Sequence, residues 1–345
     1  MSDTLPVHLL TGFLGSGKTT LLNHVLRSPA YANCAVLVNE FGEIGVDHHL
    51  IEAVHGDVVL MRSGCICCSI RGDLADAMLA LHAQRDAGSI PAFERLILET
   101  TGLADPTPVL STLMHERVLR HHFHLANIIT TVDALHAPDT LARFPQALKQ
   151  IAVADAIVLT KTDLATPEAS QQLLHTLHHI NALATVWTSA HQPPPASTLL
   201  GVAHSSVASS PSDHAPLGAF RSLARPQAPH LQAVRSWTME LPPAMDWTVF
   251  GIWLTLLLHA HGDKVLRLKG LLDVAGCDTP VVIHGVQHLV HPPSHLPCWP
   301  HAQQRRSQLV WITQGLEADA IQTSLHTFLS TFSAPAACET AALAA

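Results

Sequence analysis

The stretch GFLGSGKT, residues 12–19, has the spacing G-x-x-x-x-G-K-[ST], which is typical of loops that hold nucleotide phosphates. It follows a short apolar run, Val7–Leu10, and opens a stretch with helical periodicity. Glycines let backbone N–H groups surround a phosphate, and the start of a helix adds a favourable dipole. We predict that Lys18 reaches the β- and γ-phosphate oxygens and that the Thr19 hydroxyl binds Mg²⁺. The predicted phosphate-binding residues are Gly12, Gly15, Ser16, Gly17, Lys18, Thr19 and Thr20.

A carboxylate, Glu99, ends the apolar part of the segment RLILETTG. In proteins with such a loop, a carboxylate in this position holds Mg²⁺ directly or through water. Three residues further on, Gly102 can offer its backbone N–H to a γ-phosphate. We therefore predict that Lys18, Thr19 and Glu99 form the catalytic set for nucleotide hydrolysis.

The segment LTKTDL, after another apolar run, contains the pattern x-K-x-D with Lys161 and Asp163. One carboxylate can accept hydrogen bonds from both N1–H and N2–H₂ of guanine, whereas adenine presents an acceptor at N1. The Lys161 stem can lie over the base, and the later segment TSA places Ser189 where a backbone N–H could meet guanine O6. The pattern predicts GTP rather than ATP. Thr160 stands where GTPases more often have Asn, whose amide usually ties this loop to the phosphate loop.

Three of the seven cysteines fall within four positions, in the segment GCICCS. The thiols of Cys65, Cys67 and Cys68 can converge only if the chain turns, and Gly64 favours a turn. Three thiolates suit Zn²⁺, Co²⁺ or Cu⁺, and a closed structural zinc site has four protein ligands, so the cluster predicts an open metal site. A redox thiol pair and buried, inert cysteines are the alternatives.

The segment NEFGEIGVD, residues 39–47, precedes the cysteines and combines three carboxylates with two glycines. Such a composition is expected of a flexible segment that senses a nucleotide, with an ordinary charged loop as the alternative. The cysteine cluster therefore lies, along the chain, between two predicted nucleotide sensors.

Composition excludes several classes of function. The net charge of −8 with neutral histidines argues against broad nucleic-acid or anionic-membrane binding, which needs a basic surface. The most apolar stretch, Val249–Ala260, is too short to span a bilayer, and clustered cysteines without a signal peptide favour a cytoplasmic protein. The 26 histidines indicate either metal affinity or a solvated polar surface.

The elements that position these residues alternate between short apolar runs and longer stretches with helical periodicity up to about residue 190. This alternation predicts an α/β fold with a mainly parallel sheet, followed by a smaller α+β domain. Helices are expected over residues 74–84, 141–151, 247–259 and 318–332. The predicted division is a nucleotide-binding domain over residues 1–190, a Pro/Ser-rich linker over 191–232, a C-terminal domain over 233–333 and a tail over 334–345.

The order of TGFLGSGKTTLLNH, VNEFGEIGVD, GCICCS, ETTGLADP and LTKTDL resembles that of the CobW-like P-loop GTPases. The later segments DKVLRLKGLL, IHGVQHLVHPP and RSQLVWIT look like the C-terminal domain of that family. The resemblance implies GTP hydrolysis, with GTP or GDP, Mg²⁺ and Zn²⁺ or Co²⁺ as cofactors, and delivery of the metal to a client metalloprotein. It implies that Cys65, Cys67 and Cys68 hold the metal and that Glu40 is a further ligand.

Two other functions remain open on the sequence. The chain could be a metal buffer in which the nucleotide only stabilises the fold, or a P-loop kinase for a small acceptor. The guanine pattern argues against the kinase. A homodimer is one possible assembly, and the spacing of residues His175, His178 and His179 places them on one face of a helix, as a second metal site or as an exposed polar surface.

Overall fold

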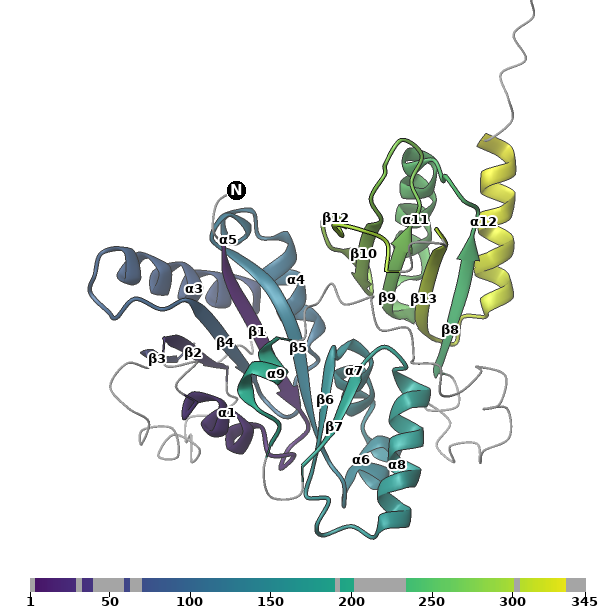
Figure 1. Cartoon of the computed structure of the whole chain (residues 1–345). Helices are drawn as coiled ribbons and strands as arrows, with labels where there is room; N and C mark the ends of the chain where they lie inside the picture. Colours follow the sequence, from purple (N-terminus) through teal and green to yellow (C-terminus); the bar gives the residue numbers. More distant parts are fainter. Residues whose placement is uncertain are drawn as a thin grey trace, which may run out of the picture.

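The computed structural model describes residues 4–28, 33–39, 59–62, 70–189, 193–201, 234–300 and 305–332. Its two sheets are built from separate parts of the chain (Figure 1). The α/β fold with a parallel sheet followed by a smaller C-terminal domain is confirmed. No helix among the described residues is long and apolar enough to cross a membrane.

The first sheet has seven strands in the order β3-β2-β4-β1-β5-β6-β7, and every pair is parallel. The strands are β1 (Leu5–Gly12), β2 (Cys34–Asn39), β3 (Val59–Arg62), β4 (Arg95–Thr100), β5 (Phe123–Asp133), β6 (Ala156–Thr160) and β7 (Thr185–Thr188). Nearly continuous burial along β1, β4 and β6 is typical of parallel strands that are covered on both faces. Because all seven strands run in the same direction, their carboxyl ends lie along one edge of the sheet.

Helices cover both faces of this sheet. They are α1 (Lys18–Leu26), α3 (Ile70–Asp86), α4 (Thr107–His115), α5 (Arg117–His122), α6 (Ala137–Arg143), α7 (Pro145–Val153), α8 (Pro167–Ile180) and α9 (Ala196–Leu200). Val7 and Leu9 of β1 pack in one core with α3, α4 and α5, whereas Leu10 packs in another with α1 and α9. The alternation of side chains along a strand thus assigns neighbouring residues to opposite helical layers.

One predicted helix, over residues 141–151, is wrong in its extent. The structure has two helices there, α6 and α7, separated at Phe144, whose φ of −125° and ψ of 104° are extended. Pro145 causes the break, because its ring disfavours the helical conformation in the residue before it. The break makes α7 a separate unit of nine residues.

The second sheet is antiparallel, in the order β11-β10-β9-β13-β8, with β12 paired to β10. Its strands are β8 (Val234–Leu241), β9 (Val265–Leu272), β10 (Val281–Val286), β11 (Leu289–Val290), β12 (Ser294–His295) and β13 (Ser307–Gln314). One face packs against α11 (Trp247–His261) and α12 (Ala318–Phe332), around buried Trp253 and Trp311; the short 3₁₀ helix η3 (Gly262–Lys264) joins α11 to β9. Trp237 is partly buried, and Trp247, at the start of α11, is 39 % exposed.

The other face of the second sheet lies against α7 and α8 of the first domain. Leu266 and Ile312 belong to the same apolar core as Leu148 and Ile151 of α7. A β-bulge on β9 contributes to this contact: Ile312 pairs with Arg267 and Thr313 with Val265, so Leu266 is the extra residue. Because a bulge interrupts the alternation of side chains, Leu266 and Arg267 both face the first domain, whereas Leu268 packs on the helices of its own domain.

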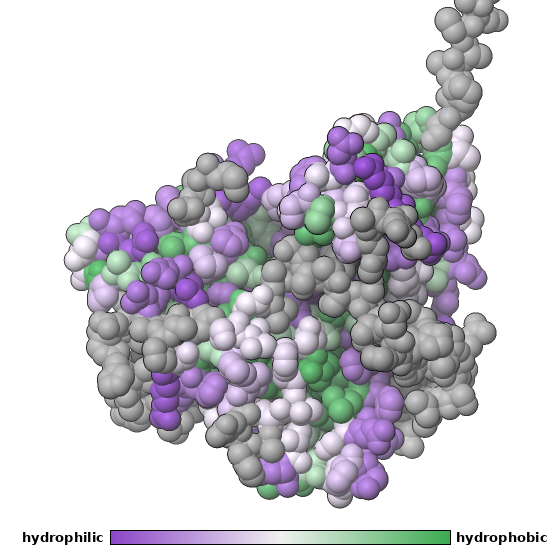
Figure 2. Space-filling model, in the orientation of Figure 1, coloured by the Kyte–Doolittle hydropathy of each residue, from purple (hydrophilic) through white to green (hydrophobic). Residues whose placement is uncertain are grey.

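The outer helices are amphipathic. On α8, Leu173, Leu177 and Ile180 are buried, and the exposed positions carry mainly Gln and His. Figure 2 shows hydrophilic residues over the outer sides of α3 and α8. The three histidines of α8 lie on this exposed side, and no group of three or more potential metal ligands occurs among the described residues.

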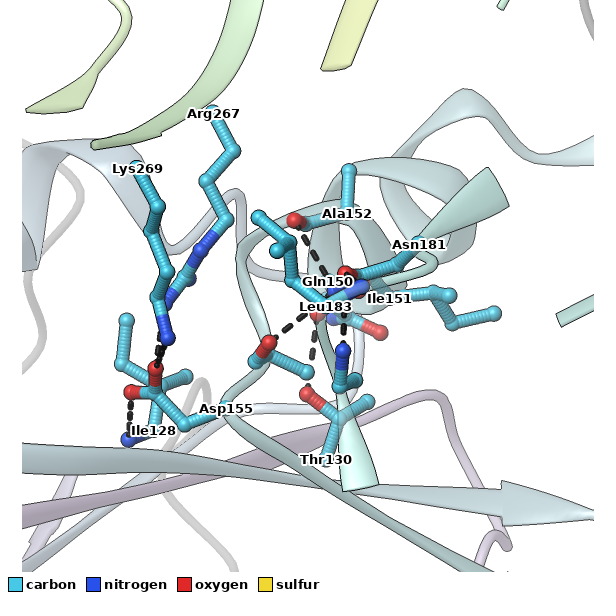
Figure 3. A network of polar contacts seen from close by, with 12 residues as sticks. Ile128, Thr130, Gln150, Ile151, Ala152, Asp155, Asn181, Leu183, Arg267 and Lys269 are labelled. Carbon is cyan, nitrogen blue, oxygen red and sulfur yellow. Dashed lines mark hydrogen bonds and ion pairs between the residues drawn. The ribbon is translucent and has the colours of Figure 1, made fainter. Parts of the chain in front are cut away.

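Asn181 fixes the carboxyl end of α7 (Figure 3). Its amide nitrogen donates to the carbonyl oxygens of Ile151, Ala152 and Ala154 at 2.8, 3.1 and 2.9 Å, and its side-chain oxygen accepts from the backbone N–H groups of Leu183 and Ala184. The last carbonyls of a helix have no partner within the helix. One fully buried side chain therefore satisfies these carbonyls and joins α7 to the chain after α8.

We predict that Asn181→Ala lowers the free energy of unfolding by about 2–4 kcal/mol, because it leaves several buried backbone groups without hydrogen bonds. Urea denaturation measures the change. Asn33→Ala, at an exposed asparagine, is the matched control and should be nearly neutral. Equal stabilities of the two variants would contradict this account of α7.

Candidate functional site

The loop between β1 and α1 has the geometry of a phosphate-binding loop. Gly17, the residue before α1, has φ 91° and ψ 20°, and Gly12 has φ 143°, both in regions that favour glycine. A side chain on Gly12 would collide with Thr131 of β5 and lie 2.8 Å from the Ser16 hydroxyl oxygen. Gly15, at φ 70°, has open space where a side chain would point. The loop thus lies close to the sheet on one side and is open on the other.

Lys18 is buried, and its side chain reaches back to the start of this loop. Its Nζ donates to the carbonyl oxygens of Gly12 at 2.9 Å and Phe13 at 3.1 Å. The hydroxyls of Ser16 and Thr131 are 2.6 Å apart, which ties the loop to β5. Thr20, another predicted phosphate ligand, is exposed in the first turn of α1. The ammonium group therefore lies at the centre of the loop, where phosphate oxygens bind in such sites.

Thr19 and Glu99 form the part of the site that fits Mg²⁺. The Thr19 hydroxyl donates to Oε1 of the buried Glu99 carboxylate at 3.3 Å, although 80 positions separate the two residues. Mg²⁺ prefers oxygen ligands in an octahedron at about 2.0–2.1 Å, so neighbouring ligands are about 3 Å apart. The two oxygens have the right chemistry and spacing for adjacent positions around one Mg²⁺ ion, which would neutralise charge on the phosphates.

The segment after β4 lies directly against the phosphate loop. A side chain on Gly102 would lie 2.6 Å from the backbone nitrogen of Leu14, so only glycine permits this approach. On its other side, the segment is held by α7: Lys149 Nζ contacts Asp105 at 2.6 Å, and Gln150 Nε2 donates to Gly102 O at 3.2 Å and Ala104 O at 3.0 Å. Gly102 thus lies beside the phosphate loop, between Leu14 and α7.

Thr160 makes the connection that an asparagine makes in many GTPases. Its hydroxyl lies 2.8 Å from the Ser16 carbonyl oxygen and 3.2 Å from that of Val132. Thr160 also faces Gly17, since a side chain on that glycine would lie 3.5 Å from its methyl group. The guanine-pattern loop is therefore joined to the phosphate loop despite the unusual residue.

Lys161 and Asp133 form an ion pair at the start of the guanine-pattern loop. Lys161 has φ 56°, and its Nζ lies 2.6 Å from Asp133 Oδ2. Burial raises the pKa of Asp133, but hydrogen bonds from Lys161, His136 and backbone N–H groups outweigh it and hold that pKa below its usual range. Asp133 was not predicted, although a carboxylate at the end of the apolar run IITTVD is the same signal that identifies Glu99.

Asp163 lies two residues after Lys161, in the turn that follows β6. The backbone N–H of Ser189 donates to Leu159 O at 2.8 Å, so it is used within the sheet and does not point to a base. Ala190, the next residue, lies outside the described residues. The structure therefore brings Lys161 and Asp163 to the edge that carries the phosphate loop and places Ser189 at the end of the adjoining strand β7.

The predicted metal ligands Cys65, Cys67, Cys68 and Glu40 lie outside the described residues. The strands that lead to them are described: β3 ends at Arg62, and β2 ends at Asn39. Val38 pairs with both Arg62 and Glu99. The chain thus leaves β2 and β3, toward the segments with Glu40 and the cysteines, at the edge of the sheet where Glu99 lies.

The free cysteines that the structure describes lie elsewhere. Cys34 is buried, Cys277 is partly exposed and Cys298 is exposed. Burial raises the pKa of the Cys34 thiol to about 12, so this residue is a neutral thiol at ordinary pH and a poor metal ligand.

Comparison with known proteins agrees with this arrangement. Residues 6–188 match the model of the CobW/HypB/UreG nucleotide-binding domain, and residues 234–329 match that of the cobalamin synthesis protein cobW C-terminal domain. The zinc chaperone YjiA of Escherichia coli is 37 % identical over 287 residues, which cover 83 % of this chain and 87 % of the relative. The zinc chaperone CobW of Pseudomonas aeruginosa is 27 % identical over 94 % of this chain and 92 % of its own.

The crystal structure of Zn(II)-bound YjiA GTPase from E. coli superposes with a TM-score of 0.69 and 30 % identity, covering 94 % of this chain and 99 % of the other. The similarity thus extends over both domains as well as over the nucleotide site. On its sequence, its fold and its site, the chain belongs to the CobW-like family of P-loop GTPases.

Proposed function

We propose that this GTPase is a zinc metallochaperone, which holds the metal at Cys65, Cys67 and Cys68, with Glu40 as a further ligand, and passes it to a client metalloprotein. The observation that carries the proposal is the position of the cysteines in the sequence: they follow β3, whose last residue, Arg62, lies at the edge of the sheet that holds Glu99. The relatives that are named zinc chaperones support the choice of metal. Three thiolates also suit Co²⁺, which makes cobalt a useful probe.

The described residues have distinct roles in the proposed cycle. Lys18 binds the β- and γ-phosphate oxygens, and Thr19 and Glu99 hold Mg²⁺, which stabilises the charge that develops on the phosphates. Gly102 senses the γ-phosphate through its backbone N–H, and its segment shifts when that group leaves. Because β3, which leads to the cysteines, ends at the same edge of the sheet, we expect GTP and GDP to favour different arrangements of the thiols, as in other order–disorder switches.

The guanine contact can be tested by changing the base that fits. Asp163→Asn should weaken GTP binding by about 100-fold or more, because an amide cannot accept both guanine donors and an unpaired donor is strongly disfavoured. Xanthosine triphosphate has a carbonyl at the position of the guanine amino group, and the variant should bind it better than the wild type does. Competition with a fluorescent GDP analogue measures both affinities.

The matched control is Asp139→Asn, at an exposed carboxylate on α6, which should leave both affinities unchanged. An Asp163→Asn variant that still prefers GTP would show that another group recognises the base.

Thr160 gives a second test, of the tie between the two loops. Thr160→Val keeps the shape but removes the hydroxyl, and it should weaken GTP and GDP binding about 3- to 10-fold, the equivalent of one hydrogen bond. Thr160→Ser retains the hydroxyl and is the control. Wild-type affinity in the valine variant would mean that the hydrogen bond does not order the site.

The metal site can be tested with Co²⁺, because cobalt–thiolate absorption reports ligation directly. The wild type should show this absorption, and a Cys65/Cys67/Cys68→Ala variant should lose it. The proposed switch also predicts a difference in Co²⁺ affinity of at least about fivefold between GDP and a non-hydrolysable GTP analogue, the lower end of typical coupling between sites.

A Cys277/Cys298→Ala variant, which removes two other free cysteines, is the control and should bind Co²⁺ as the wild type does. Thiolate absorption in the triple variant would refute the site. Equal metal affinity in the two nucleotide states would instead indicate a metal buffer.

A further inference from the structure

Helix α7 touches the segment after β4 through two adjacent side chains. Lys149 pairs with Asp105 at 2.6 Å, and this ion pair together with hydrogen bonds from Thr107 keeps the pKa of Asp105 low although burial raises it. The buried Gln150 donates to two carbonyl oxygens of the same segment. Since only the nitrogen of a carboxamide can donate, these contacts fix the orientation of Gln150.

Contacts on both sides therefore determine the position of this segment. On one side it approaches the backbone of Leu14 in the phosphate loop, and on the other side it is bound to α7. Any change in the segment that accompanies the γ-phosphate changes the distances to Gln150 and Lys149.

The carboxyl end of α7 leads to a buried cluster of charges (Figure 3). Asp155 follows α7 by two residues, and its Oδ2 accepts a hydrogen bond from the Ile128 backbone N–H at 2.9 Å. Its Oδ1 accepts hydrogen bonds from Arg267 Nη2 and from Lys269 Nζ, the latter at 2.8 Å. All three charged side chains are at most 3 % exposed.

The two cations come from β9, in the C-terminal domain. Burial lowers the pKa of both Arg267 and Lys269, and the Asp155 carboxylate opposes that effect. A buried charge that loses its partner is strongly disfavoured. The geometry of this cluster is therefore sensitive to small displacements of Asp155 relative to β9.

We propose that α7 couples the nucleotide site to the C-terminal domain: Gln150 and Lys149 contact the segment that carries Gly102, and Asp155 transmits its arrangement to Arg267 and Lys269. Helix α7 is short, about 13 Å at 1.5 Å per residue, and Asn181 holds its end, so it is a compact link. Gln150 and Lys269 are positioning residues in this scheme. The inference rests on the proposed GTP-dependent function but concerns a path that does not include the cysteines.

Reciprocity gives a measurable consequence. If the nucleotide state alters the Asp155 cluster, a change in that cluster must alter the ratio of affinities for a non-hydrolysable GTP analogue and GDP. Lys269→Met removes one cation, keeps the length of the side chain and leaves Arg267 paired with Asp155. We expect it to change this ratio at least about threefold, which is within the range that mutations between two coupled sites produce.

The matched control is Lys264→Met, at an exposed lysine just before β9, which should leave the ratio unchanged.

A second variant, Gln150→Leu, should shift the ratio in the same direction as Lys269→Met, whereas Gln146→Leu, at an exposed position of the same helix, should not. In the double variant Gln150→Leu/Lys269→Met, the shift should be smaller than the product of the single shifts, because one path is interrupted twice. Thermal melting confirms that each variant is folded.

The outcomes separate this inference from the proposed function. Tight nucleotide binding with an unchanged ratio in Lys269→Met overturns the coupling and leaves the proposed function intact. Multiplicative single shifts in the double variant also overturn it, since they indicate independent effects. A wild-type protein that binds neither nucleotide would refute the proposed function, and the coupling with it.

Discussion

The common direction of the seven strands in the first sheet is the constraint on which the site depends. Each parallel connection must return over a face of the sheet, so every carboxyl end arrives at the same edge. Gly12, Glu99, Asp133 and Thr160 end or nearly end their strands, and they are brought together from positions up to 148 residues apart in the chain (160 − 12). The hydrogen bonds Thr19–Glu99 and Thr160–Ser16 then complete an arrangement that no local segment could form.

A second constraint is the burial of charge between the domains. Asp155, Arg267 and Lys269 lose almost all contact with water, and such desolvation is tolerated only when the partners keep good geometry. Ile151, Leu266 and Ile312 also belong to one apolar core that both domains share. The C-terminal domain is thus held to α7 by contacts with strict directional requirements, in addition to ordinary apolar packing.

The sequence was most informative where a short motif has a fixed structural context. The phosphate loop, Glu99 and Gly102 could be located because each lies at or just after the end of a recognisable strand, and each of the seven strands of the first sheet corresponds to a short apolar or β-branched run. The extent of α7 was predicted less well, since helical periodicity continued across Phe144 and masked the effect of Pro145. Trp247 illustrates a general limit of such patterns, because a large apolar residue is not necessarily buried.

Contacts between distant segments could not be predicted from patterns. Nothing near Asp155 indicates that it pairs with Arg267, although two cations in the otherwise apolar run VLRLKGLL are an unusual feature. Gln150 is a polar residue on the buried side of a helix, and only the folded position of the segment with Gly102 gives it a role. Thr160 illustrates a related point: it stands where asparagine is more common, and only the folded structure shows that its hydroxyl makes the tie to the phosphate loop.

The β-bulge at Leu266 has a consequence for how this chain can change its length. Upstream of the bulge, Val265 packs with α11 and α12, and downstream Arg267 and Lys269 face Asp155. Deleting Leu266 would restore regular alternation and leave these groups on their present sides, whereas deleting Leu268, after the bulge, would turn Lys269 to the wrong side of the sheet. Single-residue deletions after the bulge should therefore be absent from functional descendants of the protein, whereas substitutions that preserve length and polarity remain open to them.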